Sequence, residues 1–410
     1  MVSWKRPLPG VRLGELINCY VQRARHLRPN IDQPGNLVVS ECEWHISPHG
    51  RSYFVHHNTR TTSWKKPMPD CPASSLTPEC IFTGHSMAVW NLAYLGTSYK
   101  VVSASADGSI RQWSRNGELV GEPWRSDGRG VGSIVVSPDA TMVVSGSTDG
   151  RLRLWNVEGG NILGEPWQGH NAPARCLAWA PNACEIASGS QDGTIRRWNP
   201  HNGEQIAPPI ETGHGRVDVI KYSSEGDRLA SGGTDYMIRV WSNDGKLLIE
   251  IKGHEGWVRS LCWSKDGTHI FSGSSDNTIR KWRSIDGKEV FVLRGHAKAV
   301  RSLCFPPDER YLVSASADYS VRIWDLNTNQ PVGNPLLHDN ELRDLAMTSD
   351  GRYIVTAGLD KKIYLWSIEA ALKQNDDQVR AHIVIFLAYS LIGFVRRECT
   401  ARHEAQGKSS

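Results

Sequence analysis

Residues 312–324 read Leu312-Val-Ser-Ala-Ser-Ala-Asp318-Tyr-Ser-Val-Arg-Ile-Trp324, which is a short apolar run, a turn and a second, alternating run. Two β-prone runs around such a turn predict a hairpin. The pattern Ser/Thr-x3-Asp-x5-Trp within this stretch occurs seven times in the chain, and successive Trp residues lie 42, 43, 43, 41, 42 and 42 positions apart. A period this constant indicates seven copies of one structural unit.

Each copy contains about four β-prone segments, the pattern of one blade of a β-propeller. In the sixth copy, Val300–Phe305 is a further apolar stretch upstream of the hairpin, and small Gly-, Asp- and Asn-rich turns separate the segments. The stretch before the first copy, about Thr77 to Thr83, has no blade of its own. We therefore expect it to pair beside Lys362–Ser367, which would close the ring and remove its open edges.

Six copies also contain a His that precedes the blade Trp by 27 or 28 residues, in Gly84-His85, Gly169-His170, Gly213-His214, Gly253-His254, Gly295-His296 and Leu337-His338. With these residues the repeats resemble the WD-repeat (WD40) family over about residues 76–368. The Gly-Glu-Pro-Trp and Gly-Asn-Pro-Leu linkers are similar to those of fungal vegetative-incompatibility-type WD arrays. The resemblance implies an all-β fold, a seven-bladed WD40 β-propeller.

The His, the Ser or Thr and the Asp of each copy have the residue types of a hydrolase triad. Because an enzyme needs one such site and not six, we favour a structural network in which buried polar groups pair with one another. The resemblance implies hydrogen-bonded tetrads made of His85, Ser103, Asp107, Trp113; His170, Ser188, Asp192, Trp198; His214, Ser231, Asp235, Trp241; His254, Ser272, Asp276, Trp282; His296, Ser314, Asp318, Trp324; and His338, Thr356, Asp360, Trp366. The second copy has Asp127 at the His position, so we expect its blade to be the least rigid.

A different pattern precedes the repeats, with Trp44 and Trp64 twenty residues apart. The stretch Gly50-Arg-Ser-Tyr-Phe-Val-His-His-Asn-Thr-Arg-Thr-Thr-Ser-Trp64-Lys-Lys-Pro67 resembles a WW domain, which implies a small three-stranded sheet. Alternation along its strands would place an aromatic groove on one face, suited to a polyproline II ligand. The resemblance implies that this groove binds Pro-rich motifs of the Pro-Pro-x-Tyr type through Tyr53, Val55, His57, Arg60, Thr62 and Trp64. The alternative is a WW fold that binds no ligand.

Arginines and tryptophans recur where each innermost strand should begin, at one rim of the central channel. Arg and Trp are enriched at binding hot spots, and Arg pairs well with carboxylate and phosphate groups. We therefore predict that an acidic or phosphorylated peptide binds Trp90, Arg175, Arg216, Trp257, Arg259, Arg301 and Arg343. Asp218 and Glu341 fall in the same columns of the repeat. The alternative is that these arginines only pack their stems on neighbouring residues.

Composition excludes several other classes of protein. The net charge of +4, from 47 Lys+Arg and 43 Asp+Glu, gives no case for nucleic-acid binding. Nine Cys occur without a Cys-x-x-Cys pair, so we expect no metal and no cofactor, and the odd number suits reduced thiols in the cytoplasm and/or the nucleus. The apolar run 383–395 is shorter than the roughly twenty residues of a spanning helix, so membrane binding is not expected.

We therefore expect five regions: an N-terminal segment with an amphipathic helix (1–39), a WW domain (40–69), a linker (70–75), the propeller (76–368) and a C-terminal tail with helix-prone sequence (369–410). A phosphate-binding loop and an unrepeated nucleophile are both missing, so we expect no enzyme. The predicted function is a non-catalytic scaffold or adaptor in which the WW domain holds a Pro-rich ligand and the propeller holds a second protein, since tethering raises the effective concentration. The alternative is a substrate receptor of a ubiquitin ligase or other regulatory complex. The stretch Trp324-Asp325-Leu326-Asn327 lacks the Arg common in such receptors.

Overall fold

The computed structural model describes residues 42–46, 52–56, 61–63, 76–96, 99–125 and 130–373. The chain divides into two units, Met1–Ser74 and Ser75–Ser410. In the first unit, β1 (Cys42–Ile46), β2 (Ser52–His56) and β3 (Thr61–Ser63) form an antiparallel sheet in that order, as the WW pattern predicts. The expected N-terminal helix and the apolar run 383–395 lie outside the described residues.

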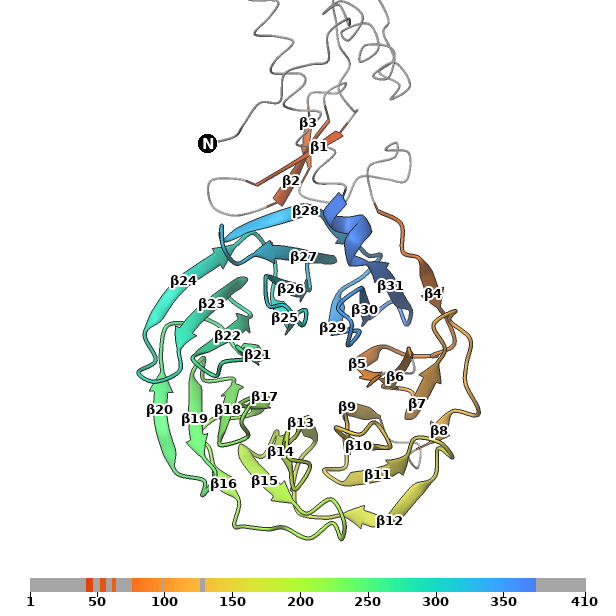
Figure 1. Ribbon diagram of the computed structural model, residues 1–410, viewed down its shortest axis with the longest axis vertical. Coiled ribbons are helices and arrows are strands. Elements are labelled where there is room, and N and C mark those ends of the chain that lie inside the picture. The colour runs from red at the N-terminus through yellow and green to blue at the C-terminus, as the bar shows by residue number, and fades with distance from the viewer. Residues whose placement is uncertain are drawn as a thin grey trace, which may run out of the picture. The chain divides into compact units, whose positions relative to one another are not determined.

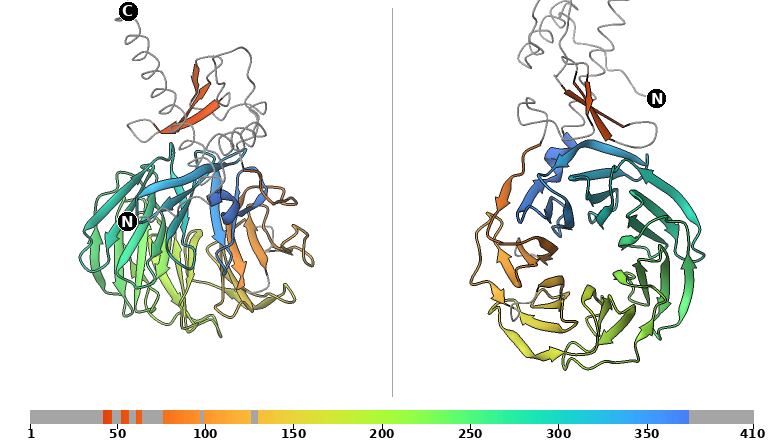
Figure 2. Two further views of the ribbon diagram at one scale, coloured as in Figure 1. Left: turned by 45° about the horizontal axis from the view of Figure 1, so that its top comes forward. Right: turned by 180° about the vertical axis from the view of Figure 1, so that it is seen from behind.

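The second unit is a ring of seven four-stranded antiparallel sheets, which confirms the predicted seven-bladed propeller (Figure 1). Six blades consist of four consecutive strands, and the innermost strand comes first in the chain. Blades are numbered one to seven by their innermost strands. Seen from behind, the seven sheets form the same closed ring, with their innermost strands toward its centre (Figure 2).

The strand bounds repeat from blade to blade. The innermost strands are β5 (Val89–Leu95), β9 (Val131–Val136), β13 (Ala174–Trp179), β17 (Val217–Tyr222), β21 (Val258–Trp263), β25 (Val300–Cys304) and β29 (Leu342–Met347). The second strands are β6 (Lys100–Ser105), β10 (Met142–Ser147), β14 (Ile186–Ser190), β18 (Arg228–Gly233), β22 (His269–Ser274), β26 (Tyr311–Ser316) and β30 (Tyr353–Gly358). The third strands are β7 (Ser109–Trp113), β11 (Leu152–Asn156), β15 (Thr194–Trp198), β19 (Ile238–Ser242), β23 (Thr278–Arg283), β27 (Ser320–Asp325) and β31 (Ile363–Ser367). The outermost strands are β8 (Trp124–Arg125), β12 (Ile162–Trp167), β16 (Ile210–Glu211), β20 (Leu247–Ile251), β24 (Glu289–Arg294), β28 (Gln330–Leu337) and β4 (Cys80–Phe82).

The ring closes through a strand from the beginning of the propeller. β4 pairs antiparallel with β31 and becomes the outermost strand of blade seven, which confirms the predicted closure. Phe82 of β4 is 1% exposed, and its ring lies 5.9 Å from that of Trp113 in blade one. On the innermost strands, Asp344 of blade seven contacts both neighbouring blades. Its carboxylate accepts hydrogen bonds from the Leu92 amide of blade one at 2.8 Å and from Ser302 of blade six at 2.7 Å. Both ends of the propeller sequence therefore hold blade seven against blade one.

The hairpin between the second and third strands turns through one left-handed residue, directly after the repeated Asp. Glycine takes this position in blades one to three, at φ values of 78°, 80° and 83°. In the other four blades the residue has a side chain, as at Tyr236 with φ 71° and Lys361 with φ 66°. Since glycine alone adopts this conformation without steric strain, these blades form the same turn at some expense of stability.

Packing between blades explains two tryptophans that the sequence placed only in linkers. Trp124 begins β8 and Trp167 ends β12. The two residues are 6% and 7% exposed, and they stack on Trp155 and Trp198 of the next blade at 6.0 and 5.9 Å. After β31, residues 368–373 form a short helix whose Ala371 packs into the core of blades six and seven. None of the helices among the described residues is long and apolar enough to cross a membrane.

Candidate functional site

Blade five shows the geometry of the repeated polar network. His254 contacts Asp276 through Nδ1 at 2.7 Å and Ser272 Oγ through Nε2 at 2.6 Å, and Trp282 Nε1 donates to the same Oγ at 2.7 Å. Ser272 is completely buried. The corresponding His–Asp, His–Ser and Trp–Ser distances are 3.0, 2.7 and 2.8 Å in blade one, 2.9, 2.7 and 2.8 Å in blade three, 2.6, 3.0 and 2.9 Å in blade four, and 2.9, 2.7 and 2.8 Å in blade six. A hydroxyl that donors and acceptors enclose in this way has no access to a substrate.

The charge state of the network follows from burial and hydrogen bonding. Burial lowers the pKa of His85, His170 and His296, so these imidazoles are neutral at pH 7. Burial by itself would raise the pKa of Asp192, but hydrogen bonds from Thr194 and His170 outweigh it and lower that pKa to about 2. In blade three the pair is therefore a neutral His170 held by an ionised Asp192, which fixes the ring for the hydroxyl.

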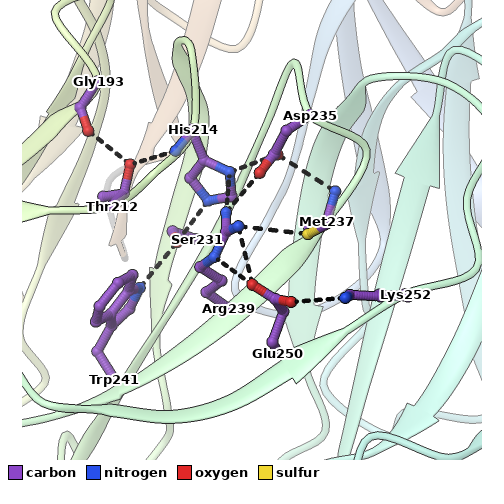
Figure 3. A network of polar contacts seen from close by, with 10 residues as sticks. All are labelled: Gly193, Thr212, His214, Ser231, Asp235, Met237, Arg239, Trp241, Glu250 and Lys252. Atoms are coloured by element: carbon purple, nitrogen blue, oxygen red, sulfur yellow. Dashed lines mark hydrogen bonds and ion pairs between the residues drawn. The ribbon is translucent and has the colours of Figure 1, made fainter.

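Blade four extends its tetrad to the surface through an arginine (Figure 3). Met237 stands where blades one, three, five and six have a Ser or Thr, and Arg239 Nη1 pairs with Asp235 at 2.6 Å. Arg239 also pairs with Glu250 at 2.9 Å, and Glu250 pairs with Lys252 at 3.1 Å. No role was predicted for this arginine, although an Arg stands two residues before the blade Trp in six of the seven copies.

Blades two and seven vary the same network. In blade two, Trp155 Nε1 donates to Ser145 Oγ at 2.8 Å, and Arg153, which is 1% exposed, pairs with Asp149 at 3.1 Å. Asp127 lies outside the described residues, so the lower rigidity expected of this blade stays a prediction. In blade seven, His338 and Trp366 contact Thr356 Oγ1 at 2.8 and 3.0 Å, and the Tyr364 hydroxyl donates to Asp360 at 2.6 Å.

Five of the seven residues predicted at the rim share one backbone feature, a β-bulge at the start of the innermost strand, whereas Arg216 and Trp257 directly precede such a strand. In blade five, Val258 pairs with Ser274 and Ser260 pairs with Gly273, so Arg259 between them has no partner on β22. A bulge redirects the side chain of its extra residue and occurs often at binding sites. The bulged residues of the seven blades are Trp90, Gly132, Arg175, Asp218, Arg259, Arg301 and Arg343. They lie at equivalent positions of the seven innermost strands, which face the centre of the ring (Figure 1).

Four residues of blades four and five form a group that we call the Asp218 cluster. Asp218 pairs with Arg216 at 2.8 Å and with Arg259 of the neighbouring blade at 3.3 Å. The Arg216 and Arg259 guanidinium carbons lie 5.0 and 4.3 Å from the ring centre of Trp257, which is 38% exposed. Cation–π contacts and a shared carboxylate thus hold an exposed indole in place.

A second group, the Glu341 cluster, joins blades six, seven and one. Glu341 lies 3.5 Å from Arg343 and 3.9 Å from Arg301, and the Arg343 guanidinium carbon lies 4.9 Å from the ring centre of Trp90. Six of the seven predicted rim residues therefore belong to one of the two clusters, and Arg175 belongs to neither.

The rim arginines also act on one another electrostatically. Burial lowers the pKa of Arg259 to about 10, together with smaller effects of Arg301, Arg216 and Arg343 and against the opposing effect of Asp218. Burial and Arg216 also lower the pKa of Arg175, and Asp218 opposes them. Five arginines with two carboxylates among them thus leave an excess of positive charge around one opening, which attracts anions.

The WW sheet supplies backbone positions for part of the predicted groove. The register places Val55 opposite Thr62. Tyr53 also lies on β2, whereas His57, Arg60 and Trp64 lie outside the described residues. Binding of Pro-rich motifs by this groove stays a prediction.

Comparison with known proteins identifies both modules. A family model for the WD domain, G-beta repeat, matches residues 76–114, 121–156, 161–199, 208–242, 245–283, 287–325 and 330–367, and a model for the WW domain matches residues 43–67. The nuclear distribution protein PAC1 of Candida albicans is 53% identical over 36 residues, which are 9% of this chain and 7% of that protein. The similarity to that relative therefore extends over less than one repeat.

Proposed function

Because this chain belongs to the WD40-repeat family and also carries a WW domain, we propose that it is a non-catalytic adaptor that holds two proteins together. Both modules fit protein–protein interaction in general. The observation that carries the proposal is the division of the polar residues between two environments. The Ser or Thr and the His of the repeated sets lie buried inside the blades with half-buried Asp partners, while the cationic and aromatic residues gather at the channel rim.

The ligand that we propose for the propeller is an acidic or phosphorylated peptide bound at the rim. Two exposed or half-buried tryptophans, Trp257 and Trp90, stand beside arginines that their clusters already orient. Preorganised arginines lose little side-chain entropy on binding, and their planar groups match carboxylate and phosphate oxygens. Indole rings beside them would pack against the apolar parts of the same peptide.

The ligand that we propose for the WW domain is a Pro-Pro-x-Tyr motif. The support is the sequence pattern, the three-stranded antiparallel sheet and the family match over residues 43–67. A polyproline II ligand is already extended, so it binds with a low entropic penalty. A weak WW contact and a weak rim contact would reinforce each other only when both ligands belong to one partner or one complex.

Affinity capture with mass spectrometry tests ligand binding by the WW domain and by the rim separately. Trp64→Ala should lose proteins with Pro-Pro-x-Tyr motifs and retain the others, whereas Arg259, Arg301 and Arg343 changed together to Glu should lose the second group. Arg294→Glu, an exposed charge reversal on the outermost strand β24, is the matched control. Thermal unfolding of each variant confirms that the ring is intact. Unchanged partners in the triple variant would disprove the rim as a binding surface.

A further inference from the structure

The two clusters occupy only part of the rim. The Asp218 cluster belongs to blades four and five, and the Glu341 cluster belongs to blades six, seven and one. Blades two and three lie between them and contribute Gly132 and Arg175 at the bulged positions. We call this part of the rim the open sector.

Arg175 differs from the other rim arginines in its lack of a partner. It is exposed, and it makes no ion pair or side-chain hydrogen bond with any residue in the described parts of the chain. The other four each share a carboxylate with a neighbour. An incoming anion must compete with that carboxylate at a paired arginine, whereas Arg175 has no carboxylate within ion-pair distance among the described residues, and Asp218 acts on it only from farther away.

Gly132 leaves room beside Arg175. A Cβ on Gly132 would lie 3.4 Å from the Ala174 carbonyl oxygen and 3.8 Å from that of Gly146, both ordinary contacts. The first contact places Gly132 next to the residue that directly precedes Arg175. Since Gly132 has no positive φ, the backbone accepts a side chain here, and its absence keeps this side of Arg175 open.

We propose that the open sector is the part of the rim that recognises the anion: Arg175 pairs with one carboxylate or phosphate group of an acidic peptide that passes over Gly132. The Asp218 and Glu341 clusters lie on either side of this sector, and their Trp257 and Trp90 side chains contact and orient the peptide. This inference rests on the proposed binding of an acidic peptide at the rim and assigns its charge recognition to one residue.

Two substitutions test the assignment from opposite sides. Arg175→Gln removes the cation. Gly132→Glu keeps Arg175 but gives it a carboxylate on the neighbouring blade, which would occupy it in place of the ligand. Gly132→Gln has the same size without the charge and controls for bulk, and Arg294→Gln removes an arginine from the outermost strand β24.

The measurement is fluorescence polarisation with the full chain and labelled peptide pools that carry a fixed central Glu, phosphoserine or Gln among degenerate positions. A charged hydrogen-bonded pair predicts that the wild type prefers the Glu or the phosphoserine pool over the Gln pool by about tenfold. Arg175→Gln and Gly132→Glu should both reduce this ratio to near one, and the salt dependence of binding should decrease with it. Gly132→Gln and Arg294→Gln should leave the ratio unchanged.

Two other outcomes have separate meanings. If Arg175→Gln retains the preference while the triple charge reversal of Arg259, Arg301 and Arg343 abolishes it, the open-sector assignment is wrong and the proposed rim function stands. If the wild type shows no preference for either anionic pool, both the assignment and the proposed acidic ligand are wrong.

Discussion

Ser272→Ala in blade five measures how much one tetrad hydroxyl contributes to the stability of the propeller. The Ser272 hydroxyl is completely buried between His254 Nε2 at 2.6 Å and Trp282 Nε1 at 2.7 Å. Alanine removes one oxygen, so little volume is lost, but both ring nitrogens lose their partner inside the blade. His254 and Trp282 are themselves only 7% and 2% exposed, so water does not replace the hydroxyl easily.

The magnitude follows from the number of groups left unpaired. Each buried polar group without a partner destabilises a protein by about 1–3 kcal/mol, so Ser272→Ala, which leaves two such groups, should lower the free energy of unfolding by about 2–6 kcal/mol. Blade two supplies the matched control, because Trp155 Nε1 is the one side-chain donor to Ser145 Oγ among the described residues. Ser145→Ala should therefore lower the free energy of unfolding by only about 1–3 kcal/mol.

Urea unfolding of the full chain, followed by far-ultraviolet circular dichroism, compares the three proteins. The midpoints should decrease in the order wild type, Ser145→Ala, Ser272→Ala, with slopes unchanged. A Ser272→Ala midpoint equal to that of the wild type, or a Ser145→Ala protein that is the less stable variant, would refute the view that the paired hydroxyl stabilises the blade.

Three further predictions concern acid, closure and the turn. Burial lowers the pKa of His85 from 6.5, so the unfolded chain binds more protons than the folded chain below that pH, and the propeller should lose stability as the pH falls below 6.5. A second loss of stability should follow between about pH 4 and pH 2, as Asp192 and its equivalents become protonated. Thermal unfolding in a pH series measures both losses. Phe82→Ala should destabilise the closing strand by about 3–5 kcal/mol while Ile81→Ala, at a 46% exposed neighbour, should have little effect; equal shifts in denaturant midpoint would argue against closure through β4. Tyr236→Gly, at φ 71° and 43% exposed, should stabilise blade four by about 1 kcal/mol, and a lower melting temperature would show that the left-handed turn is not a source of strain.

The repeat determines the architecture because each copy encodes its own local structure. Alternating runs, an Asp-centred turn and a Trp every 41 to 43 residues are enough to predict four strands per blade, seven blades and closure by the segment before the first copy. The polar tetrads were also accessible, because His, Ser or Thr, Asp and Trp recur at fixed spacing. A feature that repeats is predictable from one chain, since seven copies serve as an internal comparison.

The features that distinguish one blade from another could not be predicted from the repeat. The stacking of Trp124 on Trp155, the pairing of the buried Arg153 with Asp149, and the bulge that redirects Arg259 depend on where the strands meet. Trp124 lies in a stretch that the sequence indicates only as a linker. The sequence also did not predict that Arg153 pairs with Asp149 in the polar network of blade two.

The sequence alone thus determined the ring, its number of blades and the cationic character of one rim. Only the tertiary structure decided which rim arginines are already paired. Asp218 forms an ion pair with Arg259 across 41 residues of chain, whereas Arg175 on the adjacent blade forms no ion pair among the described residues. The reason is geometric: an ion pair forms or fails within a few ångströms, and the spacing of a repeat fixes the position of a residue in its blade but not the reach of its side chain toward the next blade.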